Sequence, residues 1–174
     1  PTSTAVITNL MFLAFARGEA ENAVALARRS AELDPVNAEA GVWLVFAFLW
    51  AGRNEEAEAE ARRVVELSPT AVFGYAGLSL RCLLQGRIEE AAAAAEREKQ
   101  DYIRLTAVAL VTWAQRRWAE SDAALSQLIK VGNAVAAYQV AWIYAYRGDA
   151  DEAFAWLDRA YMQHDSGLAL LKLD

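Results

Sequence analysis

A short motif that begins with glycine and has alanine five residues later recurs in this chain at intervals of 34 residues. Acidic side chains stand between the glycine and the alanine in every copy. A fixed interval of about 20 to 50 residues is the signature of a repeat array, in which each unit packs mainly against its neighbours. The three copies are Gly18–Ala23, Gly52–Ala57 and Gly86–Ala91.

Each interval divides into two helical segments that meet at the glycine. Residues 5–16 are apolar and residues 19–32 are amphipathic. The chain is rich in alanine and holds three prolines, a composition that favours helix. Gly18 is well suited to the position after a helix C-terminus, where the backbone often takes the left-handed conformation. The pattern therefore predicts an all-α fold with about ten helices in five antiparallel pairs.

The units are expected to form a single array over residues 1–174, although the interval is not constant. The third unit is shorter by one helical turn, and its second helix is predicted over residues 88–100. In the fourth unit, Arg116 and Arg117 replace the glycine turn, which returns at Gly148. The predicted units are residues 4–37, 38–71, 72–101, 102–133 and 134–165, followed by a truncated helix at 166–174.

These residues resemble tetratricopeptide repeats, and the resemblance covers nearly the whole chain. Small residues occupy repeat position 20 at Ala23, Ala57, Ala91, Ser121 and Ala153. Position 15 holds Gly18, Gly52, Gly86, Arg116 and Gly148, and position 32 holds Pro35 and Pro69. Met11 and Val45 at position 8 and Glu98 at position 27 depart from the family pattern. The resemblance implies a right-handed α-solenoid that binds protein partners without catalysis.

A narrower resemblance lies near the C-terminus. Residues 119–125, 138–161 and 164–174 are similar to the last repeats of large bacterial signalling proteins, which carry a cyclase-type or winged-helix domain before the array. This resemblance implies a regulatory role, and the location that we expect is cytoplasmic. The alternative that it leaves open is a region that recruits substrates for a cyclase, kinase or transferase domain absent from this chain.

The net charge of the chain and the length of its apolar runs argue against nucleic acid and membranes as partners. A net charge of −6 and a pI near 4.9 are opposite to the basic footprint of nucleic-acid-binding proteins. The longest apolar run, residues 40–51, is too short to span a bilayer and lacks the flanking basic residues of interfacial helices. We therefore expect neither nucleic acid nor membrane as a partner.

No catalytic or metal-binding pattern is found in the sequence. His164 is the single histidine, and its neighbours Asp165 and Ser166 are too close in sequence to converge with it as a triad. Cys82 is predicted to be buried and inert, and the glycines stand singly rather than in a phosphate-binding loop. The prediction is a protein with no catalytic residue, cofactor or metal.

A column of arginines has two interpretations. Repeat position 26 holds Arg29, Arg63, Arg97 and Arg159. The column could be a basic stripe for an acidic partner, or a solvated face paired with acids three residues later, such as Glu32 and Glu66. The acidic surroundings favour the second interpretation.

The candidate binding site is the groove that the first helix of each unit lines in this family. Its positions here are apolar, which argues against the charged clamp used for carboxylate-ended peptides. An exposed apolar surface of this size marks an interaction site for a partner helix, a peptide or a second copy, whereas side chains buried within the chain would be core. The predicted groove residues are Phe12, Phe15, Phe46, Leu49, Trp50, Phe73, Leu80, Leu84, Trp113, Tyr138, Trp142 and Tyr146.

Overall fold

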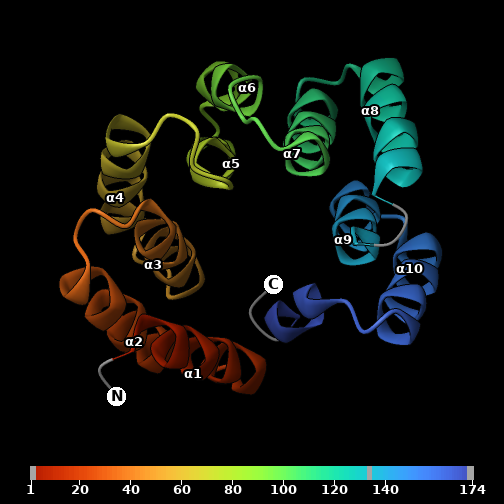
Figure 1. Ribbon diagram of the computed structural model, residues 1–174. Helices are drawn as coiled ribbons and strands as arrows, with labels where there is room; N and C mark the ends of the chain where they lie inside the picture. The colour runs from red at the N-terminus through yellow and green to blue at the C-terminus, as the bar shows by residue number, and fades with distance from the viewer. Residues whose placement is uncertain (1–2, 133–134, 172–174) are drawn as a thin grey trace. The chain divides into compact units, whose positions relative to one another are not determined.

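The computed structural model describes residues 3–132 and 135–171. In these residues the regular secondary structure consists of helices joined by short turns (Figure 1). No strand occurs in this part of the chain, so the all-α prediction is confirmed. The helices are α1 (Thr4–Arg17), α2 (Ala20–Leu33), α3 (Ala38–Trp50), α4 (Asn54–Leu67), α5 (Gly74–Leu84), α6 (Ile88–Ala95), α7 (Asp101–Ala114), α8 (Trp118–Val131), α9 (Ala137–Arg147) and α10 (Ala150–Met162). A 3₁₀ helix, η1, follows at Ser166–Leu170, where the sequence predicted a truncated helix; residues 172–174 lie outside the described part.

The helices group into two compact units that divide within α5. The first unit extends to Arg81 and includes the segment from Ala169, and the second is Cys82–Leu168. In the first unit, α1 packs on α2, α2 on α3 and α3 on α4. In the second, α6 packs on α7, α7 on α8, α8 on α9 and α9 on α10. These neighbours include four of the five expected helix pairs, namely α1–α2, α3–α4, α7–α8 and α9–α10. The third pair, α5–α6, and the union of the pairs in a single array stay predictions.

The turns inside the helix pairs share one backbone conformation. Gly18, Gly52, Gly86 and Gly148 have φ angles of 73°, 70°, 74° and 82°. Arg116 takes the equivalent place between α7 and α8 with φ 60°. An L-residue in this left-handed region costs about 1–2 kcal/mol that glycine avoids. The repeat therefore imposes the glycine conformation even where the sequence supplies arginine.

The variant Arg116→Gly should raise the free energy of unfolding by about 0.5–1 kcal/mol, since relief of the strained φ exceeds the entropy cost of glycine. The reverse change, Gly52→Ala, should lower it by about 1 kcal/mol. A Cβ at Gly52 would meet no atom within 4 Å, so the loss would come from the backbone alone. Urea denaturation measures the free energy of unfolding of both variants. A loss of stability in Arg116→Gly would contradict this explanation.

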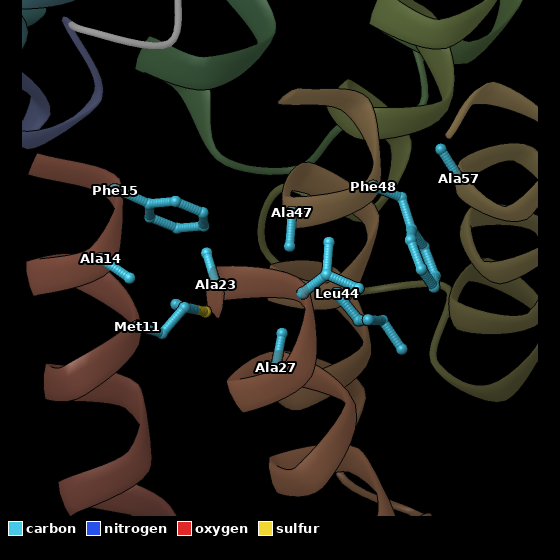
Figure 2. Close-up of a cluster of buried hydrophobic side chains, with 10 residues drawn as sticks. Met11, Ala14, Phe15, Ala23, Ala27, Leu44, Ala47, Phe48 and Ala57 are labelled. Carbon is cyan, nitrogen blue, oxygen red and sulfur yellow. The ribbon is translucent and has the colours of Figure 1, made fainter. Parts of the chain in front are cut away.

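Small side chains let the paired helices approach closely. Ala23, Ala57, Ala91 and Ser121, all at repeat position 20, have no exposed surface. Figure 2 shows the resulting core of the first unit, in which side chains from α1, α2, α3 and α4 meet. Its members are Met11, Ala14, Phe15, Ala23, Val24, Ala27, Leu44, Ala47, Phe48 and Ala57.

The second helix of the third unit is shorter than predicted. The sequence indicated a helix over residues 88–100, but α6 ends at Ala95. Beyond this point the buried side chain of Glu98 folds back on the chain. Its Oε1 accepts hydrogen bonds from the backbone N–H groups of Lys99 and Gln100, at 3.0 and 3.2 Å. The carboxylate thus satisfies the backbone of a turn to α7, which accounts for the missing helical turn.

Candidate interaction surface

The predicted groove residues of the first unit fall into two groups. Phe15 is fully buried and Phe46 is 9% exposed, so their assignment to a partner-contacting surface is wrong and they belong to the core. They lie deeper because α1 and α3 also bury their sides against neighbouring helices. The half-buried members, which keep part of their surface in solvent, are Phe12, Leu49, Trp50, Phe73 and Leu80.

Ring contacts connect the aromatic members of this group into a continuous layer over α1, α3 and the residue before α5. The ring of Trp43 lies 4.8 Å from that of Phe12 and 6.0 Å from that of Phe73, centroid to centroid. Trp50 lies 4.8 Å from Phe15 and 5.3 Å from Phe46. Such ring pairs are favourable beyond the area they bury. We call the half-buried set the aromatic wall; it comprises Phe12, Trp43, Leu49, Trp50, Phe73 and Leu80.

Trp43 was not among the predicted groove residues. It stands at repeat position 6, which the sequence analysis did not assign to the groove, and its ring contacts with Phe12 and Phe73 place it in the wall. Its bulk and its place in the apolar run of residues 40–51 were the available signals. Leu170 also packs against the core of the first unit beside these residues.

Phe73 reaches the wall through a strained backbone. Its φ angle is 66°, in the left-handed region that bulky residues rarely adopt. From there its ring contacts Phe46 at 5.9 Å and Trp43 at 6.0 Å. Strain of this kind persists where surrounding contacts hold it, and it clusters at functional sites.

The groove residues of the second unit differ in exposure. Leu84 and Tyr146 are 62% and 44% exposed, and Trp113 and Trp142 are half-buried. Tyr138 is only 4% exposed, so its assignment to the surface is wrong. Its ring is covered by the segment at Gly167, where an added Cβ would stand 2.5 Å from the Tyr138 Cδ1 atom. Four of the five predicted residues on this unit therefore present surface to solvent.

A cluster of side chains holds Trp113 at the end of α7. Its ring lies 4.4 Å from that of Trp118, and the Arg147 guanidinium stacks 4.8 Å from its centre. Arg147 also pairs with Asp122 at 2.8 Å and donates to the buried Ser121 hydroxyl. This cluster fixes Trp113 through a cation–π contact and an ion pair rather than leaving it free to follow a ligand.

Asp165 provides the N-terminal cap of α9, which has no capping side chain of its own. Its Oδ2 accepts from the Tyr138 N–H at 3.0 Å and its Oδ1 from the Gly167 N–H at 2.9 Å. Burial raises the pKa of the Asp165 carboxyl, and the backbone hydrogen bonds offset part of that rise. A carboxylate at a helix N-terminus satisfies free N–H groups and the helix dipole.

The raised pKa of Asp165 predicts a pH dependence with a definite sign. Because the folded state binds this proton more tightly than the unfolded state, the group adds stability in acid, and that increment is lost as pH rises through the folded pKa. The difference in unfolding free energy between the wild type and Asp165→Asn should therefore fall as pH rises from about 3 to 7. Urea titrations at several pH values measure it, and a difference that grows with pH would contradict the assignment.

Two arginines of the column, Arg29 and Arg63, are paired with acids, whereas the Arg159 guanidinium lies 4.7 Å from the centre of the Trp156 ring. Arg29 lies 3.6 Å from Glu32, as expected. Arg63 pairs with Glu60 at 2.6 Å, so the predicted pairing with Glu66 is wrong. Glu60 lies one helical turn before Arg63, and Arg63 also donates to the Pro35 carbonyl, which draws its side chain toward the preceding loop.

Side chains that could take part in catalysis or bind a metal are few and scattered in the described part of the chain. Cys82 is buried, as predicted, and His164 is exposed in the left-handed turn after α10. No cluster of three or more metal-ligating side chains occurs in residues 3–132 and 135–171. Within the same residues, every helix is too short or too polar to cross a membrane. A surface pocket of the first unit is lined mainly by Arg28, Arg29, Arg53, Glu21 and Glu32, and its arginines are paired with acids.

The comparison with protein families gives a match over part of the chain. Residues 14–79 match the family model of the tetratricopeptide repeat. No curated protein matches the chain in sequence.

Solved structures extend the similarity to most of the chain. TTC0263, a thermophilic tetratricopeptide repeat protein of Thermus thermophilus, superposes with a TM-score of 0.74 at 21% identity, over 92% of this chain and 91% of that one. PilF of Pseudomonas aeruginosa gives 0.66 at 18% identity, over 92% and 76%. MamA gives 0.55 at 18% identity, over 85% and 90%. The chain therefore has the α-solenoid fold of tetratricopeptide repeats, a fold that generally mediates protein–protein interaction without catalysis.

Proposed function

We propose that this chain is a non-catalytic interaction module that binds an apolar helix of a partner protein through the aromatic wall. In this proposal it forms the regulatory C-terminal part of a cytoplasmic bacterial signalling protein. The similarity of residues 119–125, 138–161 and 164–174 to the terminal repeats of such proteins supports the setting, as do the bacterial sources named for two of the similar structures.

The observation that carries the proposal is the chemistry of the aromatic wall. Its six side chains are apolar or aromatic, and they keep part of their surface in solvent although they adjoin the core. Large aromatic side chains in such positions supply much contact area at a small cost in conformational entropy, and they dominate the binding energy of many interfaces. A charged or carboxylate-ended peptide would find no basic side chain in the wall, so the ligand that fits is an amphipathic helix with an apolar face.

Selection of amphipathic helical peptides from a displayed library against the intact chain, followed by binding to glutamate variants, tests the proposal. Leu80→Glu in the wall should weaken the selected peptides more than about tenfold, since a buried unpaired carboxylate costs over about 1.4 kcal/mol. The matched control is Leu67→Glu, at the exposed end of α4. Equal binding by both variants, with unchanged helicity, would refute the wall as the site.

Leu84→Glu and Val131→Glu form a second matched pair, on the second unit, because these residues are 62% and 60% exposed. Leu84 is a predicted groove residue, whereas Val131 ends α8. Loss of peptide binding in Leu84→Glu alone would support the predicted groove residues of this unit. Loss in neither variant, together with loss in Leu80→Glu, would confine the site to the aromatic wall.

A further inference from the structure

The segment that leads into α5 differs from the segment that leads into α3. Residues 34–37 separate α2 from α3, whereas the longer segment 68–73 separates α4 from α5. Asn37 ends the shorter segment, and its Oδ1 accepts hydrogen bonds from two backbone N–H groups of α3, at 3.0 and 3.3 Å. The residue 34 positions later is Ala71, which has no side-chain acceptor. Because this cap is lacking, α5 begins only at Gly74.

A hydrogen-bonded turn over residues 71–74 takes the place of the first turn of α5. The N–H of Gly74 donates to the Ala71 carbonyl at 3.0 Å. The φ angle of Val72 is negative and that of Phe73 is 66°, which is the sign pattern of a type II turn. The third residue of such a turn is normally glycine or asparagine, because other side chains are strained at positive φ. Phe73 therefore occupies a turn position for which a large aromatic residue is poorly suited.

Two other helices begin after a residue with an extended backbone. Asn37 precedes α3 with φ −77°, and Gln100 precedes α7 with φ −81°. Phe73 differs from both in its φ angle, although its carbonyl likewise accepts the first helical hydrogen bond, from the Gly77 N–H at 2.9 Å. In a regular α5 that began as α3 does, Phe73 would take the place of Glu39, which is exposed. A regular helix start would thus direct the Phe73 ring toward solvent.

The turn instead places the Phe73 ring in the aromatic wall. The centre of the ring lies 5.9 Å from that of Phe46 and 6.0 Å from that of Trp43. Phe73 is only half-buried there, so it has part of the stabilisation that full burial of a phenylalanine brings. A strained φ and an uncapped helix oppose this gain. The stability of the fold therefore does not explain a phenylalanine at this position, and strain of this kind is typical of functional sites.

We propose that Phe73 contacts the ligand of the aromatic wall and that the turn over residues 71–74 positions its ring for this contact, although this conformation lowers the stability of the fold. The inference rests on the proposed function, because the ligand is the amphipathic helix that the wall binds. A ring that is already in place loses little conformational freedom when the helix binds. The apolar face of the partner helix would then carry a side chain that packs on Phe73.

The variant Phe73→Gly removes the ring and keeps a residue that accepts the positive φ. A helical peptide selected from a displayed library against the intact chain should bind this variant about tenfold more weakly than the wild type. The urea midpoint should fall by less than about 0.5 M, because relief of the strained φ offsets the lost ring contacts. The matched control is Val72→Gly, at a residue that has negative φ and is 48% exposed. This control should be less stable than the wild type and bind the peptide equally well.

The variant Ala71→Asn keeps the ring and changes the backbone. An asparagine at this place can cap α5 as Asn37 caps α3, so the helix should gain its first turn and withdraw Phe73 from the wall. We expect a higher urea midpoint together with weaker binding of the same peptide. Thr70→Asn introduces the same side chain at the preceding, exposed residue and should change neither quantity.

The split between stability and binding decides the role of Phe73. A Phe73→Gly variant that binds the peptide as the wild type does would overturn the inference. A fall of its urea midpoint by more than about 0.5 M would also overturn it, because the ring would then serve the fold. Weaker binding in Leu80→Glu alone would remove Phe73 from the site and leave the proposed function standing. Unchanged binding in both Leu80→Glu and Phe73→Gly would contradict the proposed function as well.

Discussion

Replacing Phe15 with alanine should lower the free energy of unfolding by about 3–5 kcal/mol. Phe15 has no exposed surface, and its ring lies 4.8 Å from that of Trp50 and 6.0 Å from that of Phe12. Removal of the ring opens a cavity in the core shown in Figure 2, where Met11 and Ala14 cannot fill the space. Urea denaturation followed by circular dichroism measures the loss.

The control is Phe12→Ala, which removes the same side chain from the same helix at a half-buried position. Its cost should be about half that of Phe15→Ala or less, since part of the ring already contacts water. The sequence placed both Phe12 and Phe15 in the groove. The difference between the two losses of stability therefore tells which of them belongs to the core and which to the aromatic wall. A Phe15→Ala variant as stable as the wild type would contradict the assignment of Phe15 to the core.

The second large effect concerns the small residues at repeat position 20. The variant Ala57→Leu should lose about 1–3 kcal/mol, because the added carbons would have to enter the space where α3 and α4 are in contact. Ala57 is fully buried and belongs to the same core as Leu44 and Phe48 (Figure 2). Thermal unfolding and urea titration give the change.

Ala59→Leu is the matched control, since Ala59 lies on the same helix two residues later and is exposed. Its effect should stay within about 0.5 kcal/mol. Similar effects of the two substitutions would mean that helix propensity, rather than close approach of the helices, determines the choice of alanine at this position.

The sequence predicted the helices and their turns well because both follow from local features that the repeat multiplies. Four glycines in the left-handed conformation and the buried small residues at position 20 are where the period placed them. The period also gave the position of the turn at Arg116, although no glycine marks it. The family model and the similar structures confirm the fold inferred from these features.

The sequence did not predict which apolar residues are buried in the core and which lie in the aromatic wall. Phe12 and Phe15 are the same residue type on one helix, and their difference in burial comes from α2, α3 and their side chains rather than from local pattern. Likewise, the early end of α6 depends on the two backbone hydrogen bonds that the Glu98 side chain accepts. Propensity alone extends that helix through its glutamate and lysine residues.

The most direct test of the aromatic wall as the binding surface is a ¹H–¹⁵N spectrum of the tryptophan indoles during titration with a selected helical peptide. The chain has six tryptophans. Trp43 and Trp50 lie in the wall, while Trp118 and Trp156 lie on helices of the second unit outside the predicted groove. We predict that the signals of Trp43 and Trp50 move with the peptide and those of Trp118 and Trp156 stay in place. Movement confined to Trp118 and Trp156 would contradict the account.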